Sequence, residues 1–193
     1  TRSGPGDWRP VGRPEYLRQQ CELSLRHLGL ERIELYQLHR IDAKVPLEDQ
    51  LGELVLLQQE GKIRHIGLSE VSVDQLRQAQ EIATIVSVQN LYNLANRSAE
   101  DLLEHAEAQG IAFIPWFPLA TGSLAGDGGP LDRLSAELGA SPSQLALAWL
   151  LRRSPVMLPI PGTSSVAHLE DNLAAAGIEL TDEQEAQLTA AVG

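Results

Sequence analysis

Cysteine is almost absent from this 193-residue sequence. Cys21 is the only one, so no disulfide can form within the chain. It falls on the apolar face of a predicted helix, where a small buried side chain is the ordinary interpretation. The sequence therefore gives no reason to expect a reactive thiol or a disulfide-stabilised fold.

Positive charge is also scarce. Lys and Arg number 15 against 26 Asp and Glu, which gives a net charge of −11. Such a surface repels phosphate backbones and anionic lipid, so nucleic acid and membrane surfaces are excluded as expected partners. The longest apolar run, Leu145 to Leu151, is far shorter than the roughly 20 residues of a membrane span, and no basic-then-apolar leader opens the chain. We expect a cytoplasmic protein.

Apolar residues are plentiful enough for a sizeable core. They make up 43% of the sequence, so we expect residues 1–193 to form a single domain. Thr1 to Arg13 is rich in Gly, Pro and Arg and predicts a loop. Gly122 to Gly129 predicts a long surface loop between periodic segments.

Helical and strand-like segments alternate from Pro14 onward. Leu17, Cys21, Leu25 and Leu28 share one face of a predicted helix that ends at Gly29, and a second helix is expected from Leu47 to Glu60. Short apolar strands are predicted at residues 33–38, 63–68, 85–88, 111–115 and 156–160. Further helices are indicated by a hydroxyl residue three positions before a side chain that can reach back to it, at Ser72 with Gln75, Ser98 with Asp101, Ser141 with Gln144, and Thr181 with Gln184.

This alternation predicts an α/β fold of parallel strands, for which two architectures compete. A doubly wound sheet gathers polar groups at two or three strand ends, whereas a (β/α)8 TIM barrel brings every strand end to one mouth. Polar or aromatic residues follow all five strands, at His39, Ser69 and Glu70, Gln89 and Asn90, Trp116, and Gly162 to Ser165. We therefore favour an incomplete barrel covering roughly strands 4–8, with about three βα units, or about 80 residues, expected upstream of Thr1.

Five segments, in order, resemble one known family. They are SLRHLGLERIELYQLHRID (24–42), GKIRHIGLSE (61–70), VQNLYN (88–93), IPWFPLATGSL (114–124) and IPGTSSVAHLEDN (160–172). Together they resemble the C-terminal part of the aldo-keto reductases, which are barrel enzymes. The resemblance implies that His39 is the catalytic histidine, and that the family's tyrosine, lysine and aspartate lie upstream of Thr1. The segment 1–193 alone would then be inactive.

The resemblance also implies a nicotinamide-nucleotide site without a metal. Ser69, Glu70 and Gln89 would bind the carboxamide, Glu70 standing where the family often has asparagine, and Trp116 would stack on the ring. The remaining predicted cofactor contacts are Phe117, Leu119, Thr121, Gly122, Ser123, Leu124, Ile160, Gly162, Thr163, Ser164, His168, Asp171 and Asn172. Some of these assignments have an ordinary alternative: Trp116 as a core aromatic, Gln89 as a strand-end turn former, the Thr163 segment as a turn and helix cap, and Asp171 and Asn172 as solvated helix residues.

The function implied is hydride transfer from NADPH to the carbonyl of an aldehyde or ketone, reversible as alcohol oxidation. NADPH is preferred to NADH on the resemblance, although His168 stands where relatives often have arginine. Two other interpretations stay open: a nucleotide-binding, redox-sensing regulatory subunit with little turnover, and a five-stranded doubly wound binding module without catalysis. The expected partner is a small carbonyl compound, while its identity and the oligomeric state are not indicated.

Overall fold

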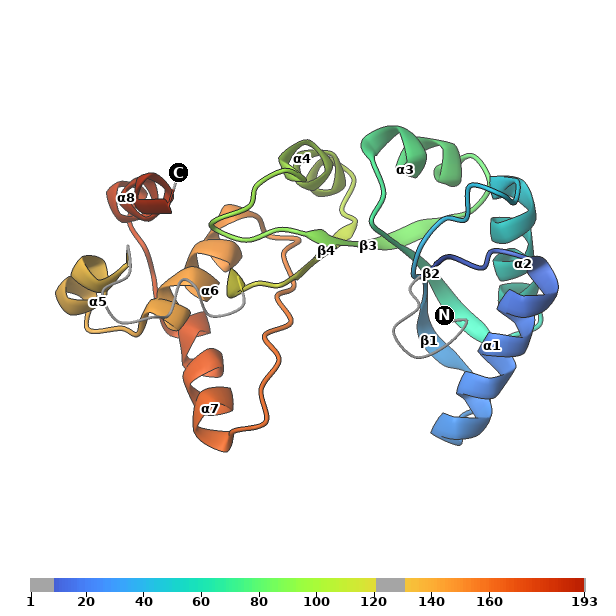
Figure 1. Cartoon of the computed structure of the whole chain (residues 1–193), viewed down its shortest axis with the longest axis horizontal. Coiled ribbons are helices and arrows are strands. Elements are labelled where there is room, and N and C mark those ends of the chain that lie inside the picture. Colours follow the sequence, from blue (N-terminus) through green and yellow to red (C-terminus); the bar gives the residue numbers. More distant parts are fainter. Residues whose placement is uncertain (1–8, 121–130, 193) are drawn as a thin grey trace. The chain divides into compact units, whose positions relative to one another are not determined.

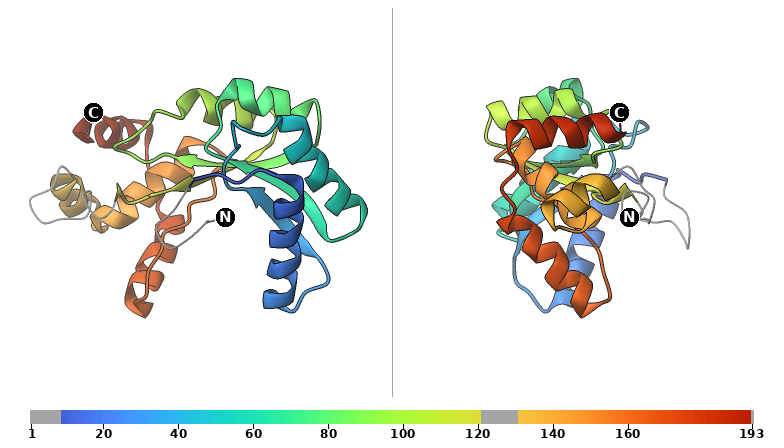
Figure 2. Two further views of the ribbon diagram at one scale, coloured as in Figure 1. Left: turned by 45° about the vertical axis from the view of Figure 1, so that its right-hand side comes forward. Right: turned by 90° about the vertical axis from the view of Figure 1, so that its left-hand side faces the viewer.

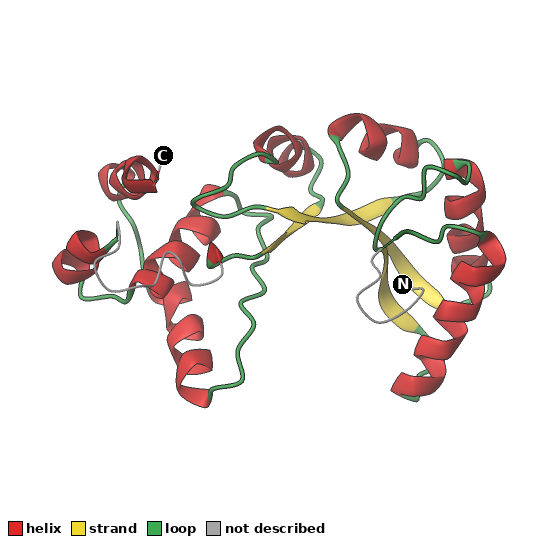
Figure 3. Ribbon diagram, in the orientation of Figure 1, coloured by secondary structure: helices red, strands yellow, loops and turns green. Residues whose placement is uncertain are grey.

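The computed structural model describes residues 9–120 and 131–192, and its elements alternate along the chain as expected (Figures 1 and 3). They are α1 (Pro14–Leu28), β1 (Ile33–Leu38), α2 (Leu47–Gln59), β2 (Ile63–Ser69), α3 (Val73–Gln80), β3 (Ile85–Leu91), α4 (Glu100–Ala108), β4 (Ala112–Trp116), α5 (Asp132–Leu138), α6 (Pro142–Arg153), α7 (Val166–Ala174), a 3-10 turn η2 (Ala175–Gly177), and α8 (Asp182–Val192). Helix α5 and the short 3-10 turn η2 were not predicted from the sequence.

The strands form one sheet in the order β1-β2-β3-β4. The β1–β2 and β2–β3 pairs are parallel, and each strand lies beside its predecessor in the chain. A doubly wound sheet would reverse direction at a switch point, and this order has no reversal. The α/β prediction is confirmed, and the strand order agrees with consecutive strands of a barrel.

The strand predicted at residues 156–160 is wrong. This segment makes only an isolated parallel bridge from Met157 to Phe113, with Phe113 N–H donating to Val156 O and Leu158 N–H to Phe113 O, both at 2.8 Å. The pairing stops at this bridge for two reasons. Pro115, the next residue of β4 that would donate, has no N–H, and on the other side the Val156 N–H donates to Ser154 Oγ at 3.3 Å.

The chain divides into two compact units, Thr1–Gln89 and Asn90–Gly193. In the first unit, α1 and α2 lie side by side (Figure 2). The core residues of α1 are Leu17, Cys21 and Leu25, as predicted, but Leu28 is 60% exposed because it ends the helix at the left-handed Gly29. From α2 the core receives Leu51, Leu54 and Leu57.

An ion-pair cluster joins α1 to the end of α2. The Arg18 guanidinium lies 2.6 Å from Glu53 and makes a two-pronged hydrogen bond to Glu60 at 2.7 and 2.8 Å. Lys62 pairs with Glu60 at 2.9 Å and with Glu22 at 2.7 Å. The hydrogen bond from Arg18, helped by that from Lys62, lowers the pKa of Glu60 to about 2.

This lowered pKa predicts acid sensitivity. A carboxylate with a folded-state pKa below its unfolded value stabilises the fold above the unfolded pKa and loses that effect as the pH falls. The free energy of unfolding should therefore drop more for the wild type than for Glu60→Gln between about pH 5 and about pH 2.5. Denaturant titrations at both pH values measure it, with Glu31→Gln, on an exposed turn, as the control. Equal pH dependence in wild type and Glu60→Gln would contradict the pairing.

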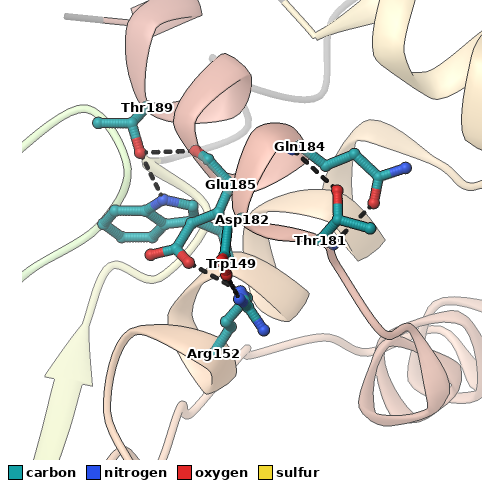
Figure 4. Close-up of polar contacts among 7 residues, drawn as sticks. All are labelled: Trp149, Arg152, Thr181, Asp182, Gln184, Glu185 and Thr189. Carbon is teal, nitrogen blue, oxygen red and sulfur yellow. Dashed lines mark hydrogen bonds and ion pairs between the residues drawn. The ribbon is translucent and has the colours of Figure 1, made fainter.

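Aromatic side chains form the core of the second unit. Tyr92 stacks on Trp149 with ring centroids 6.0 Å apart and meets Phe113 edge-on at 5.8 Å. Helix α8 is fastened to α6 beside this cluster (Figure 4): the Trp149 Nε1–H donates to Thr189 Oγ1 at 2.8 Å, and Arg152 pairs with Glu185 at 2.7 Å. The second unit thus couples its C-terminal helix directly to the aromatic core.

Three of the four predicted helix caps are confirmed. Reciprocal hydrogen bonds join Ser72 with Gln75, Ser141 with Gln144, and Thr181 with Gln184. The cap at Ser98 is wrong, because Ser98 donates both its N–H and its hydroxyl to Asn96 Oδ1 and α4 begins one residue later than predicted, after Ala99. Ser98 therefore takes part in a turn that is stabilised by the Asn96 side chain and does not cap the helix.

Across the described parts of the chain, no helix combines the length with the apolar character that crossing a membrane requires.

Candidate functional site

Three predicted residues form a row near the carboxyl ends of β1, β2 and β3: His39 follows β1, Ser69 is the last residue of β2, and Gln89 lies within β3, which continues to Leu91 instead of ending at Val88 as predicted. Strand pairing sets Ser69 opposite Gln89, and it sets Gln37 opposite Gly67, two residues before His39 and Ser69. Side chains two residues apart on a strand share a face. The register therefore places Ser69 beside Gln89, and continued one residue past the last pair, Leu38 with Leu68, it places His39 beside Ser69 on the same face.

A second row, formed by Gln37, Gly67 and Ser87, lies two residues before the first row on each strand. Gln37 Nε2–H donates to Ser87 Oγ at 3.2 Å, across the intervening strand at Gly67. A Cβ on Gly67 would lie 2.2 Å from Ser87 Oγ and 2.9 Å from Gln37 Cγ. Only glycine leaves room for this bridge, which forms a polar floor beneath the row of candidate site residues.

Gly67→Ala should therefore disturb both the floor and the fold. The added methyl group must displace Ser87 or Gln37, and overpacking of this kind costs about 1–3 kcal/mol of unfolding free energy. Gly52→Ala is the matched control, since its Cβ meets nothing within 4 Å in α2 and alanine favours a helix. Denaturant unfolding of both variants measures the difference. A Gly67→Ala protein as stable as Gly52→Ala would show that the floor is not packed as described.

The loop after β1 is held in place by a buried carboxylate. Asp42 accepts the backbone N–H groups of Lys44 and Gly12, both at 3.0 Å, and these bonds lower its pKa. The side chain of Gln50 in turn bonds the backbone N–H and C=O of Asp42 at 2.9 and 3.0 Å. The segment that follows His39 thus has a fixed path, which the sequence analysis did not foresee.

Glu70 follows the row in a left-handed conformation, with φ at 55°. Its N–H donates to Gln89 O at 2.9 Å, which continues the β2–β3 pairing by one residue. Asparagine tolerates this conformation better than most residues, whereas an ordinary side chain costs about 1 kcal/mol or more. The backbone at this position therefore suits asparagine, and Glu70 adopts the turn at a conformational cost.

The predicted ring-stacking residue lies at the end of β4, in the second unit. Trp116 is half-buried, and its ring centroid is 5.0 Å from that of Phe117, which is 45% exposed. Phe117 is left-handed, with φ at 58°, and the buried Asn93 fixes it by donating its Nδ2–H to Phe117 O at 2.9 Å. Asn93 is a positioning residue within the quoted VQNLYN motif that received no role from the sequence.

The predicted phosphate-binding segment precedes α7. Gly162, Thr163 and Ser164 are exposed, and Thr163 Oγ1 accepts the N–H of Ser165 at 3.1 Å. Ser165 caps α7 by accepting the N–H of His168 at 3.4 Å. The cap and turn that the sequence offered as the ordinary alternative are therefore present, and they can coexist with phosphate binding.

The other predicted cofactor residues differ in their burial and in their contacts. Asp171 Oδ2 accepts the hydroxyl of Ser141 at 2.9 Å, and its carbonyl accepts Gln144 Nε2–H at 3.3 Å, so Asp171 holds the start of α6. Leu119 and Asn172 are half-buried, and Ile160 and His168 are exposed. The remaining predicted contacts, Thr121, Gly122, Ser123 and Leu124, lie outside the described residues.

Two tyrosines can be assessed as proton donors. Burial raises the pKa of Tyr36 to about 12. Burial, together with the hydrogen bond from its hydroxyl to Glu100 at 2.5 Å, also raises the pKa of Tyr92. A tyrosine that gives a proton to a carbonyl near neutral pH needs the opposite shift. The pKa values of both residues are thus shifted away from the range that such an acid needs.

The small cavity beside β1 is not a dinucleotide site. It encloses about 190 Å³ and is lined by residues of β1, α1 and α2 together with Pro10, His39 and Arg40. Pockets for drug-sized ligands occupy about 300–1,000 Å³. Among residues 9–120 and 131–192, no three His, Cys, Asp or Glu side chains are grouped as metal ligands would be.

Comparison with known proteins identifies the family: the chain belongs to the aldo/keto reductase family, whose model matches residues 1–192. It is 56% identical over 188 residues to an uncharacterized oxidoreductase of Schizosaccharomyces pombe, covering 97% of this chain and 61% of that protein. It is 41% identical to pyridoxine 4-dehydrogenase of Escherichia coli, covering 94% of this chain and 65% of that protein. The chain thus spans less than two thirds of the length of these relatives.

A solved structure supports the same fold. The thermostable aldo-keto reductase Tm1743, crystallised with the inhibitor epalrestat, matches with a TM-score of 0.86 and 30% identity, over 93% of this chain and 67% of that one. The predicted family and the predicted α/β fold of the barrel class are confirmed. The four-stranded sheet is consistent with part of such a barrel.

Proposed function

We propose that the protein is an oxidoreductase that transfers a hydride between NADPH and the carbonyl of an aldehyde or ketone, reversibly as alcohol oxidation. The observation that carries the proposal is the row of His39, Ser69 and Gln89 at the ends of three adjacent parallel strands. In barrel enzymes this end of the strands is where active sites are built. Both compared curated relatives are described as an oxidoreductase or a dehydrogenase.

The side chains of the row suit the nicotinamide end of the cofactor. A carboxamide has a carbonyl that accepts and an NH₂ that donates, and the Ser69 hydroxyl and Gln89 amide can satisfy both. The cofactor supplies the hydride when it is bound, while the protein orients the reactants and polarises the carbonyl. His39 would donate a ring N–H to the carbonyl oxygen as negative charge develops there.

The proton for that oxygen needs a separate acid. The family resemblance implies that a tyrosine activated by a lysine supplies this proton. Thr163, Ser164 and the start of α7 would bind the ribose phosphate, since hydroxyls and helix N–H groups stabilise anions. The preference for NADPH over NADH, the cytoplasmic location and the carbonyl substrate are parts of this proposal.

Turnover by the intact protein tests the proposal. Purified protein is mixed with NADPH and a panel of small aldehydes and ketones, with pyridoxal included because one relative is described as a pyridoxine dehydrogenase. Loss of NADPH absorbance that depends on the carbonyl compound is the expected result, and parallel assays with NADH give the cofactor preference. Tight NADPH binding without turnover would favour the redox-sensing regulatory subunit. A protein that shows neither NADPH binding nor turnover would overturn the proposal.

A further inference from the structure

Arg40 joins the ends of two strands at the candidate site. It directly follows His39, and its Nη1–H donates to the carbonyl oxygen of His39 at 2.7 Å and to Ser69 Oγ at 3.1 Å. The Arg40 side chain is half-buried, and Ser69 is 4% exposed. A permanently charged guanidinium therefore contacts the middle residue of the His39–Ser69–Gln89 row.

This contact determines what the Ser69 hydroxyl can do. Arginine has only donors and stays protonated, so in its bond with Arg40 the Ser69 oxygen must be the acceptor. A hydroxyl has one hydrogen, and that hydrogen is then left for another acceptor. A charged donor on the oxygen also polarises the O–H bond, which strengthens it as a donor.

We propose that Arg40 is a positioning residue that makes the Ser69 hydroxyl a dedicated donor to the carbonyl oxygen of the nicotinamide carboxamide. The proposal rests on the proposed function, because it deepens the assignment of the same site. The carboxamide oxygen requires a donor, and Arg40 prevents Ser69 from turning its hydrogen toward β1. Gln89, on the other side of Ser69 in the row, remains able to accept from the carboxamide NH₂.

A double-mutant cycle in the intact protein tests this role. The variants are Arg40→Met, which keeps the length of the side chain without donors, Ser69→Ala, and the two combined. NADPH binding is measured by fluorescence titration. Arg40→Met should raise the Kd for NADPH about 5-fold or more in the wild-type background. In the Ser69→Ala background it should raise the Kd less than about 2-fold, because Ser69→Ala has already removed the interaction through which Arg40 acts. Arg40→Lys should recover part of the affinity.

Controls separate this role from general support of the fold. Arg64→Met removes an exposed arginine of β2 that pairs with Glu34 at 3.0 Å, and it should leave the Kd unchanged. The Arg40→Met effect should persist with the 3-acetylpyridine analogue of NADPH, which keeps the carbonyl oxygen but lacks the NH₂. Thermal unfolding shows whether each variant is folded, and Arg40→Leu, which also lacks donors, replaces Arg40→Met if the latter is not.

The outcomes are distinguishable. An Arg40→Met effect that is equal with and without Ser69, or absent in both, overturns the role of Arg40 and leaves the proposed function standing. A wild-type protein that neither binds NADPH nor turns over carbonyl compounds overturns both.

Discussion

His39→Ala should lower kcat/KM for carbonyl reduction by about 100-fold or more. The carbonyl oxygen gains negative charge as hydride arrives, and His39 lies at the end of β1 in line with the predicted carboxamide-binding residues. Alanine removes the donor that would stabilise this charge. Most of the loss should appear in kcat, since the bond strengthens in the transition state. Steady-state kinetics of the intact protein with NADPH and its best aldehyde measures the effect.

The matched control for this histidine is His27→Ala. His27 is exposed near the end of α1, and its loss should leave the kinetics unchanged. NADPH affinity should also change little in His39→Ala, because the residue acts on the substrate carbonyl. An unchanged kcat/KM in His39→Ala would rule out its catalytic role, and a loss confined to NADPH binding would reassign it to the cofactor.

Trp149→Ala should cost about 3–5 kcal/mol of unfolding free energy, the largest stability effect that we expect from one substitution. Trp149 is 2% exposed, stacks on Tyr92 and donates to Thr189 in α8. The substitution leaves a cavity in the aromatic core of the second unit and releases one attachment of its last helix. Denaturant unfolding followed by far-UV circular dichroism gives the change.

Thr189→Val separates the contribution of the Trp149 hydrogen bond from that of the packing of its ring. It removes the acceptor of the Trp149 hydrogen bond while nearly keeping the volume of the side chain, so it should cost only about 1–2 kcal/mol. A Trp149→Ala variant that is no less stable than Thr189→Val would show that the ring stacking contributes nothing.

Local sequence signals predicted most of the fold. The pairs of Ser72 with Gln75 and Ser141 with Gln144 predict helix starts because their hydrogen bonds depend only on spacing within one turn. Gly29 likewise predicts a helix end, and it takes the left-handed conformation that such an end requires. The carboxyl-end row was predictable because parallel strands bring successive strand ends to one edge.

Features that depend on tertiary neighbours were not predictable. The strand expected at residues 156–160 is apolar, but Pro115 of β4 offers no N–H and the Val156 N–H donates to Ser154, so the pairing is limited to one bridge. Ser98 has the spacing of a helix cap, but its hydroxyl donates to the side chain of Asn96 instead. Arg40 and Asn93 acquire their roles only through partners 29 and 24 residues away, Ser69 and Phe117. No local pattern marks such contacts.

The structure of the intact protein crystallised with NADP⁺ tests the central claim most directly. We expect the nicotinamide carboxamide within hydrogen-bonding distance of Ser69 and Gln89, at the carboxyl ends of β2 and β3, with His39 beside the reactive face of the ring. A nicotinamide ring bound at the amino ends of these strands, or away from them altogether, would contradict the account.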